Sequence, residues 1–316
     1  MLARQVANGV RLPSPALAST WRTWLSTVRA DYGDGGCTSG DFHPHTDTDG
    51  RAAMMGVHQA RWKPDGWGAA VRIGVLTPHA DVGPESELRA VAPAGVAVHA
   101  ARVPFGAMAA GGGMDATIPL APVRAFAEPP HVDDAAELLA AAPLRAIAYG
   151  FTSSAYVIGA QAEAEMVARL ERRTRGIPVV ATCAATLAAL RTVGASRIAL
   201  VDPPWFDVEL NGLGRRYYES AGFEVVDSAP CGLPSDQAKI TPGALHAWVT
   251  EHAHHDADAI VIGGNGFRAV GVITALEEDL ERPVLTANQT LLWAALRAAG
   301  ADPGWVDGYG RLFSRG

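Results

Sequence analysis

The sequence predicts an α/β protein built from two similar halves, each a parallel four-stranded sheet flanked by helices, with a ligand site between them. From Val71 onward, short runs of β-branched and small apolar residues alternate with segments of helical periodicity. That alternation is typical of parallel sheets with crossover helices. Three sequence blocks also recur in the same order in both halves. The strands end in turns rich in Gly, Pro and small polar residues, where open α/β sheets bind their ligands.

The predicted elements follow one another without long gaps. In the first half, we expect strands at 71–76, 96–103, 146–150 and 178–182. Their connections are predicted to be a helix after TPHADVGPESEL, a Gly- and Pro-rich loop over 106–130 that could act as a lid, a helix over 132–142, and a helix after the FTSS turn. In the second half, we expect strands at 197–202, 223–227, 259–263 and 283–288, with helices from about 184, up to 221, over 242–254, after Arg268 and over 289–299.

The recurring blocks indicate an internal duplication. VRIGVLTP (71–78) matches SRIALVDP (196–203), AIAYGFT (146–152) matches AIVIGGN (259–265), and IPVVATC (177–183) matches RPVLTAN (282–288). Three matches in one order are typical of a repeated unit. Each half then supplies three strand ends, which are Pro78, Phe151 and Cys183 in the first and Pro203, Gly264 and Asn288 in the second. The predicted organisation is an irregular arm over 1–67, a first half over 68–182 with 291–316 packing back on it, and a second half over 183–290.

Composition narrows the class of protein. The 316 residues carry 33 acidic against 26 basic side chains, a formal charge of −7, which argues against non-specific nucleic-acid binding. No apolar run approaches the roughly 20 residues of a membrane helix, and the N-terminus lacks the apolar segment of a signal peptide. Cys37, Cys183 and Cys231 suggest neither a disulfide framework nor a zinc site, and Cys37 with His43 and His45 is too sparse a set for a metal. We therefore expect a cytoplasmic protein without membrane, nucleic-acid or metal partners.

Several segments together resemble a known superfamily. They are IGVLTP followed by GPESE, YGFTSS, GIPVVAT, RIALVDPPW, the AIVIGGNG strand end and DGYGRLF, and they span about residues 70 to 313. In this order they resemble the aspartate/glutamate racemase superfamily, in the branch of maleate cis-trans isomerase and arylmalonate decarboxylase. The resemblance implies two Rossmann-like halves, no cofactor, no metal, and chemistry at a carbon next to a carboxylate. It also implies a small-molecule carboxylate substrate and a homo-oligomer.

The resemblance further implies one cysteine at a strand end of each half. Such thiols exchange protons or attack the substrate, and their pKa can be tuned toward neutrality. At the two matching positions this sequence has Phe151 and Gly264, so racemisation by two cysteines and thiol-addition isomerisation are not expected. The candidates for proton transfer are then His79, Asp81 and Cys183 at the neighbouring strand ends.

Each of these candidates has a structural alternative. His79 either exchanges protons or caps the following helix. Asp81 either acts in the site or is a favourable acidic residue in the first turn of that helix. Cys183 either transfers protons or is a small buried apolar side chain.

The substrate-binding candidates are also carried over from the resemblance. Thr152 and Ser153 would hold a carboxylate, and Gly264, Asn265 and Gly266 would form the corresponding cradle in the other half. Donors of this kind stabilise an oxyanion by roughly 3–4 kcal/mol each. Trp205 or Phe206 lies where the relatives have a tyrosine above the substrate. Pro78 and Asn288 complete the ring of strand ends, and Arg268 either binds a carboxylate bidentately or points to solvent.

Three functional hypotheses follow. The first is a cofactor-independent decarboxylase or isomerase that acts at the α-carbon of a small carboxylic acid through an enediolate. The second is a catalytically lapsed protein that binds a small acid. The third is an enzyme for a neutral or cationic, hydantoin-like substrate, because Asp81 lies near a position where the isomerases carry a carboxylate-binding asparagine and would repel a second carboxylate.

Overall fold

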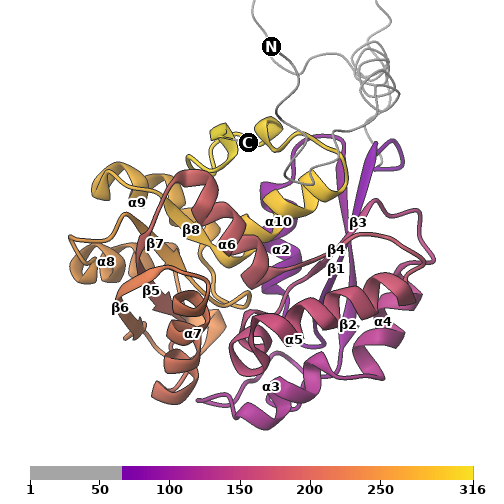
Figure 1. The fold of residues 1–316 in the computed structure, drawn as a ribbon, viewed down its shortest axis with the longest axis horizontal. Coiled ribbons are helices and arrows are strands. Elements are labelled where there is room, and N and C mark those ends of the chain that lie inside the picture. Colours follow the sequence, from indigo (N-terminus) through magenta and orange to yellow (C-terminus); the bar gives the residue numbers. More distant parts are fainter. Residues whose placement is uncertain (1–65, 316) are drawn as a thin grey trace, which may run out of the picture. The chain divides into compact units, whose positions relative to one another are not determined.

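The computed structural model describes residues 66–315, with side chains up to residue 314. The chain divides into two units at Val71, and every helix and strand described below belongs to the second, Val71–Gly316 (Figure 1). The predictions for the N-terminal arm, including the sparse set of Cys37, His43 and His45, lie outside the described residues.

The second unit contains two four-stranded parallel sheets. The first has the order β2-β1-β3-β4, formed by β1 (Val71–Pro78), β2 (Val96–Val103), β3 (Ala146–Tyr149) and β4 (Val179–Ala181). The second has the order β6-β5-β7-β8, formed by β5 (Arg197–Asp202), β6 (Glu224–Pro230), β7 (Ala259–Ile262) and β8 (Val284–Thr286). The predicted α/β class is confirmed. The identical strand order also agrees with the sequence repeat.

The strands β3 and β7 are continuous apolar runs because helices cover both of their faces. Every residue of β3 and β7 is buried. The helices are α2 (Gly83–Val91), α3 (Leu120–Ala127), α4 (His131–Leu139), α5 (Thr152–Arg173), α6 (Thr182–Val193), α7 (Val208–Ser220), α8 (Pro242–His252), α9 (Ile273–Leu280) and α10 (Ala287–Ala298), with short 3₁₀ turns η1 (Gln237–Lys239), η2 (Val270–Val272), η3 (Pro303–Trp305) and η4 (Phe313–Arg315). None of the described helices is long and apolar enough to cross a membrane.

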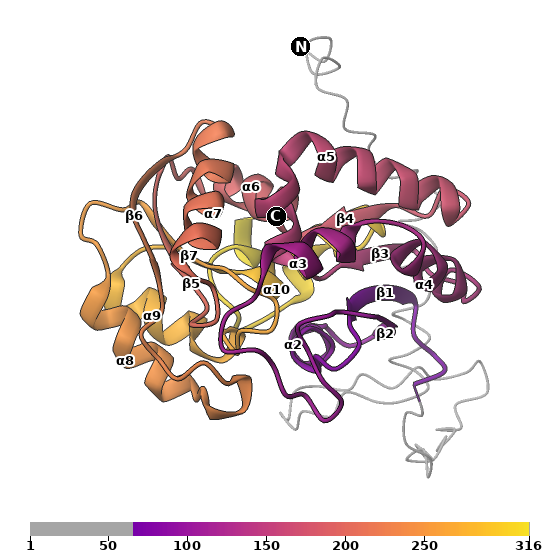
Figure 2. The same ribbon diagram turned by 90° about the horizontal axis from the view of Figure 1, so that it is seen from below.

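Helices α6 and α10 join the two sheets. They pack on each other, and α10 contacts β3 and β4 of the first sheet as well as β8 of the second. Figures 1 and 2 show the two sheets on either side of this helix pair. The carboxyl ends of the strands in both sheets therefore approach one region of the molecule.

The prediction of a loop over 106–130 is wrong for the second part of this segment, which forms α3. Val123 and Phe126 of this helix are buried, and the helix packs against α5. Prolines before, within and after the segment concealed its helical periodicity. The helix predicted after the FTSS turn is also interrupted, because Gly159 adopts φ 81° and ψ 165° inside α5.

Candidate active site

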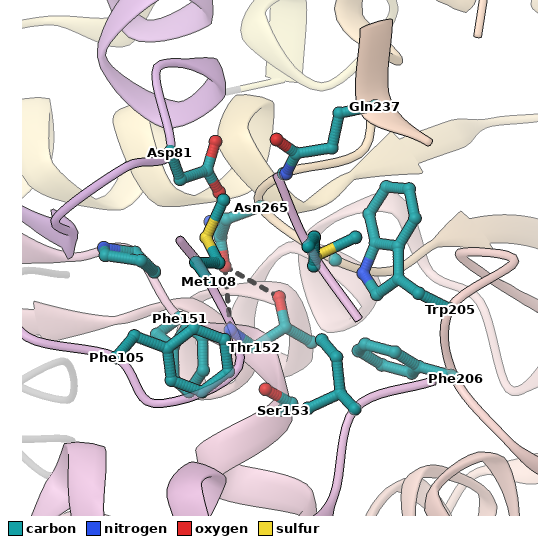
Figure 3. Close-up of a pocket in the computed structure, with 15 residues that line it drawn as sticks. Asp81, Phe105, Met108, Phe151, Thr152, Ser153, Trp205, Phe206, Gln237 and Asn265 are labelled. Atoms are coloured by element: carbon teal, nitrogen blue, oxygen red, sulfur yellow. Dashed lines mark hydrogen bonds between the residues drawn. The ribbon is translucent and has the colours of Figure 1, made fainter. Parts of the chain in front are cut away.

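A small pocket lies at the carboxyl ends of β1, β3, β5 and β7. The turns after β3 and β7 face one another across it, and the connections after β1 and β5 complete its sides (Figure 3). Its cavity volume is about 30 Å³, which is space for very few water molecules. The 15 lining residues are Pro78, Asp81, Phe105, Met108, Met114, Ile118, Phe151, Thr152, Ser153, Trp205, Phe206, Gln237, Gly264, Asn265 and Gly266.

The two facing turns are joined by hydrogen bonds to Asn265. Its Oδ1 accepts from the Thr152 N–H at 2.8 Å and from the Thr152 hydroxyl at 2.7 Å (Figure 3). Both Thr152 donors are therefore occupied within the protein. The two turns, 151–153 and 264–266, form what we call the pocket floor. In this structure, Thr152 stabilises the floor instead of offering its donors to a ligand.

Other donors of the floor remain available. The backbone N–H groups of Ser153, Gly264, Asn265 and Gly266 have no hydrogen-bond acceptor among the described residues. All four residues line the pocket, and Ser153 adds a hydroxyl group. Neutral donors from two facing turns can together hold the negative charge of a carboxylate or enediolate.

The two positions at which the resemblance implies cysteines are structurally specialised. Gly264 has φ +82°, and a Cβ built on it would lie 2.5 Å from Cγ of Pro203, so this backbone suits glycine alone. Phe151 packs its ring against Phe126 and Phe105 at centroid distances of 4.0 and 4.9 Å. Gly264 thus contributes only backbone to the pocket, and Phe151 contributes an apolar ring. None of the 15 lining residues is a cysteine.

Asp81 is the single ionisable side chain among the lining residues. It follows β1, is 4% exposed, and its Oδ1 accepts from the Gly83 N–H at 2.8 Å. Burial raises the pKa of the Asp81 carboxyl, while the Gly83 N–H, the Gln237 side chain and the positive charge of Arg102 oppose the shift. Asp81 thus has the burial and the direction of pKa shift that suit a proton donor.

Gln237 meets Asp81 from the other half of the fold. A Cβ on Gly266 would lie 2.0 Å from Gln237 Nε2 and 2.7 Å from Asp81 Oδ2, so the missing side chain at Gly266 makes room for this pair. Figure 3 shows the two side chains approaching from opposite sides of the pocket. Sequence reasoning missed Gln237 because it lies on the short 3₁₀ turn η1, where no periodicity or motif marks it.

An apolar wall faces the polar floor. It is formed by Phe105, Met108, Met114 and Ile118 from the connection between β2 and α3, and by Trp205 and Phe206 after β5. The connection is held in place from the other half, since the Ile118 N–H donates to the Trp205 carbonyl at 3.0 Å. Trp205 and Phe206 were identified from the sequence. The wall residues of the connection were not, because nothing local shows that a Gly-rich loop folds over a pocket.

The structure does not bring Cys183 to the pocket. It is fully buried, and its thiol donates to the Thr152 carbonyl oxygen at 3.5 Å. Burial, with the nearby Glu163 and Asp202 carboxyl groups, raises the pKa of the Cys183 thiol well above its ordinary value. The side chain is therefore a neutral thiol behind the floor, as the structural alternative for this residue expected.

His79, Arg268 and Asn288 also lie outside the pocket lining. His79 and Arg268 are exposed and face a separate outer cleft of about 850 Å³, and His79 Nδ1 accepts from the Phe105 N–H at 3.1 Å. Asn288 is buried behind Asn265, whose Nδ2 donates to Asn288 Oδ1 at 2.8 Å. Gln237 and Gly266 line both the pocket and the outer cleft, so they separate the two spaces. In the described part of the chain, no group of three His, Cys, Asp or Glu side chains could hold a metal ion.

The protein has two duplicated α/β halves with a pocket at their strand ends. It therefore belongs to the class of two-lobed α/β proteins that the sequence resemblance predicted. The chain belongs to the arylmalonate decarboxylase family, whose sequence model matches residues 124–313. The arylmalonate decarboxylase of Bordetella bronchiseptica is 27% identical over 173 residues, which cover 51% of this chain and 68% of that protein.

Solved structures show the same fold. A maleate isomerase from Pseudomonas putida S16, solved with maleate, superposes with a TM-score of 0.67 at 24% identity over 78% of this chain and 98% of its own. A crystal structure of arylmalonate decarboxylase superposes with a TM-score of 0.62 at 21% identity, over 78% of this chain and 100% of its own. A Nocardia farcinica maleate cis-trans isomerase with a covalently bound succinylcysteine intermediate superposes with a TM-score of 0.65 at 22% identity, over 77% of this chain and 98% of its own. These likenesses confirm the predicted fold, and the match to the family model agrees with the branch expected from the sequence.

Proposed function

We propose that the chain is an enzyme that decarboxylates or isomerises a small carboxylic acid at its α-carbon through an enediolate, and that Asp81 transfers the proton without a cysteine or cofactor. The observation that carries this proposal is the position of Asp81, the single ionisable side chain lining the pocket, next to a floor of neutral donors. Membership of the arylmalonate decarboxylase family supports the class of reaction.

The floor would stabilise the charge that develops in the reaction. When the bond between the α-carbon and the leaving carboxylate breaks, its electron pair passes into the remaining carboxyl group and forms the enediolate. The N–H groups of Ser153, Gly264, Asn265 and Gly266 would face that charge, each well-placed donor contributing about 3 kcal/mol. Since the cavity measures only about 30 Å³, the connection between β2 and α3 would have to move outward to admit the substrate. Its apolar residues would then hold the α-substituent and keep water away from the carbanionic carbon.

Asp81 would then complete the reaction. Its carboxyl proton passes to the α-carbon, and the resulting carboxylate regains a proton from water in the outer cleft. In an isomerisation, the ionised Asp81 would first remove the α-proton, and the enediolate would have to turn over in the pocket before Asp81 returned the proton to its other face. Burial, which raises the pKa of Asp81, favours the protonated form that decarboxylation requires.

A protonated Asp81 also changes the argument about substrate charge. The repulsion that led us to consider neutral or cationic substrates applies only to the ionised carboxylate. A neutral carboxyl group can instead donate a hydrogen bond to a substrate carboxylate. The site therefore favours an acid with an apolar α-substituent over a hydantoin-like ring.

The test is the reaction of phenylmalonate in heavy water. We expect the wild type to release carbon dioxide and to form phenylacetate with one deuterium at the α-carbon, measured by proton NMR. Asp81→Asn keeps an oxygen for the Gly83 N–H but has no acidic proton, so the rate should fall by about 10²–10⁴-fold. His79→Ala is the matched control, because His79 faces the outer cleft, and its rate should stay near that of the wild type.

The outcomes separate the hypotheses. Undiminished turnover by Asp81→Asn contradicts the role of Asp81. A wild-type chain whose melting temperature rises with phenylmalonate, but which releases no carbon dioxide from any of a panel of substituted malonates and exchanges no α-proton, is a binding protein instead of an enzyme.

A further inference from the structure

A chain of buried side-chain hydrogen bonds runs from Glu87 on α2 to the pocket floor. Asn288 Nδ2 donates to Glu87 Oε2 at 2.8 Å, and Asn265 Nδ2 donates to Asn288 Oδ1 at 2.8 Å. Asn265 Oδ1 then accepts from the Thr152 N–H and hydroxyl at 2.8 and 2.7 Å. All four residues are less than 9% exposed. The chain connects the first half, through Glu87 and Thr152, with the second, through Asn265 and Asn288.

The direction of this chain is fixed at both ends, by the Glu87 carboxyl group and by the Thr152 N–H, which can only donate. Both Glu87 oxygens accept here, Oε1 from two backbone N–H groups and Oε2 from Asn288, so Asn288 turns its NH₂ group toward Glu87. The carbonyl oxygen of Asn288 then faces Asn265, which must donate, and Asn265 is left with its own oxygen toward Thr152. Reversing any one amide would place two donors or two acceptors in contact, at a cost comparable to a buried unsatisfied group.

Glu87 also anchors the segment that follows the Gly264–Gly266 turn. Its Oε1 accepts from the N–H groups of Ala269 and Val270 at 2.7 and 3.1 Å. Asn288 Nδ2 makes a second bond, to the Asn265 carbonyl oxygen at 2.8 Å. Burial raises the pKa of Glu87, and the three N–H donors around its carboxylate oppose that shift. One carboxylate thus holds both the side chain of Asn265 and the backbone beyond it.

We propose that Glu87 is a positioning residue for the site: through Asn288 it fixes the orientation of Asn265, and thereby the two facing turns that present the floor donors. The consequence for substrate binding rests on the proposed function. The hydrogen-bond relay itself does not, and it can be tested without a substrate. The sequence repeat places Asn288 at a strand end, and the structure places it outside the pocket lining. Its role is to connect Glu87 with Asn265 in this chain of hydrogen bonds.

The test is amide hydrogen exchange followed by NMR. Glu87→Gln keeps the size of the side chain, but its amide can no longer accept from both sides, so one link of the relay must break or reverse. We expect the Thr152 amide to exchange about tenfold faster, as for the loss of one hydrogen bond, while the amide of Ala148 in β3 keeps its wild-type rate. Glu277→Gln is the control, since Glu277 is also buried and accepts from two backbone N–H groups, those of Val284 and Arg311.

A second variant keeps the test decisive if Glu87→Gln does not fold. Asn288→Ala removes the middle link and should raise the Thr152 exchange rate in the same way. Unchanged Thr152 exchange in both variants overturns the proposal, and so does an equal rise at Thr152 and Ala148, which would show that Glu87 only stabilises the fold. The affinity for phenylacetate, measured by calorimetry, should fall about fivefold in Glu87→Gln, as for the loss of one hydrogen bond, and stay unchanged in Glu277→Gln. A wild-type chain without turnover refutes the proposed function but leaves the exchange result valid.

Discussion

Replacement of Gly264 by alanine should destabilise the protein for two separable reasons. Its φ of +82° lies in the left-handed region, where a side chain costs about 1–2 kcal/mol. The added Cβ would also lie 2.5 Å from Cγ and 3.0 Å from Cδ of the Pro203 ring. Overpacking of this kind costs roughly 1–3 kcal/mol, so the free energy of unfolding should fall by about 2–5 kcal/mol in total.

Gly194→Ala isolates the first of these costs. Gly194 ends α6 with φ 77° and ψ 21°, and a Cβ there would meet no atom within 4 Å. This variant should lose only about 1–2 kcal/mol. Urea unfolding of both variants and the wild type, followed by circular dichroism, gives the difference that belongs to the contact with Pro203.

Equal losses in Gly264→Ala and Gly194→Ala would refute the steric argument and show that the Pro203 ring yields without cost. The outcome bears directly on the chemistry of the site. Cysteine carries the same Cβ as alanine, so a thiol at Gly264 would meet the same obstacle. A large additional loss would therefore mean that this turn cannot take a catalytic cysteine without rearranging the proline after β5.

Two further predictions concern titratable groups. Burial raises the pKa of Asp202 from 3.8 to about 7, so the folded protein keeps a proton that the unfolded chain releases near pH 4. The free energy of unfolding should therefore fall by up to about 1.4 kcal/mol per pH unit between pH 4 and 7 on account of this group. Urea unfolding at several pH values should show a correspondingly shallower slope for Asp202→Asn, and an unaltered slope would contradict the assignment. The Gln237 side chain lowers the pKa of Asp81, so Gln237→Ala should raise the pH at which the proposed decarboxylation is lost as Asp81 ionises. A shift to lower pH in the pH–rate profile would contradict this prediction.

The architecture could be predicted from the sequence because its signals are local. Strand β5 coincides with its predicted range and β7 lies within its own, since buried parallel strands are continuous apolar runs. The repeat then predicted two equal sheets with facing turns. Helix α3 was missed because the surrounding prolines indicate a loop, while the burial of Phe126 against its neighbours depends on tertiary packing.

The site could be predicted only where it coincides with strand ends. Asp81, Thr152 and Asn265 directly follow strands or their turns, and the structure places all three on the pocket. Gln237 and Met108 reach it from irregular segments, which no spacing connects with a strand end. Cys183 shows the opposite limit: it lies at a matched strand end, but its side chain points behind the floor, and the sequence does not reveal that direction.

The duplication also explains why proton transfer in this pocket should be one-sided. In the register of the repeat, Thr152 corresponds to Asn265, so the hydrogen bonds that join the two turns connect equivalent residues of the two halves. The same register pairs Asp81 with Phe206, and both side chains line the pocket. One half therefore offers an acid where the other offers a phenyl ring, which cannot donate a proton. On the proposed mechanism, an enediolate held between them would receive its proton from the Asp81 side alone, and the product would have a single configuration.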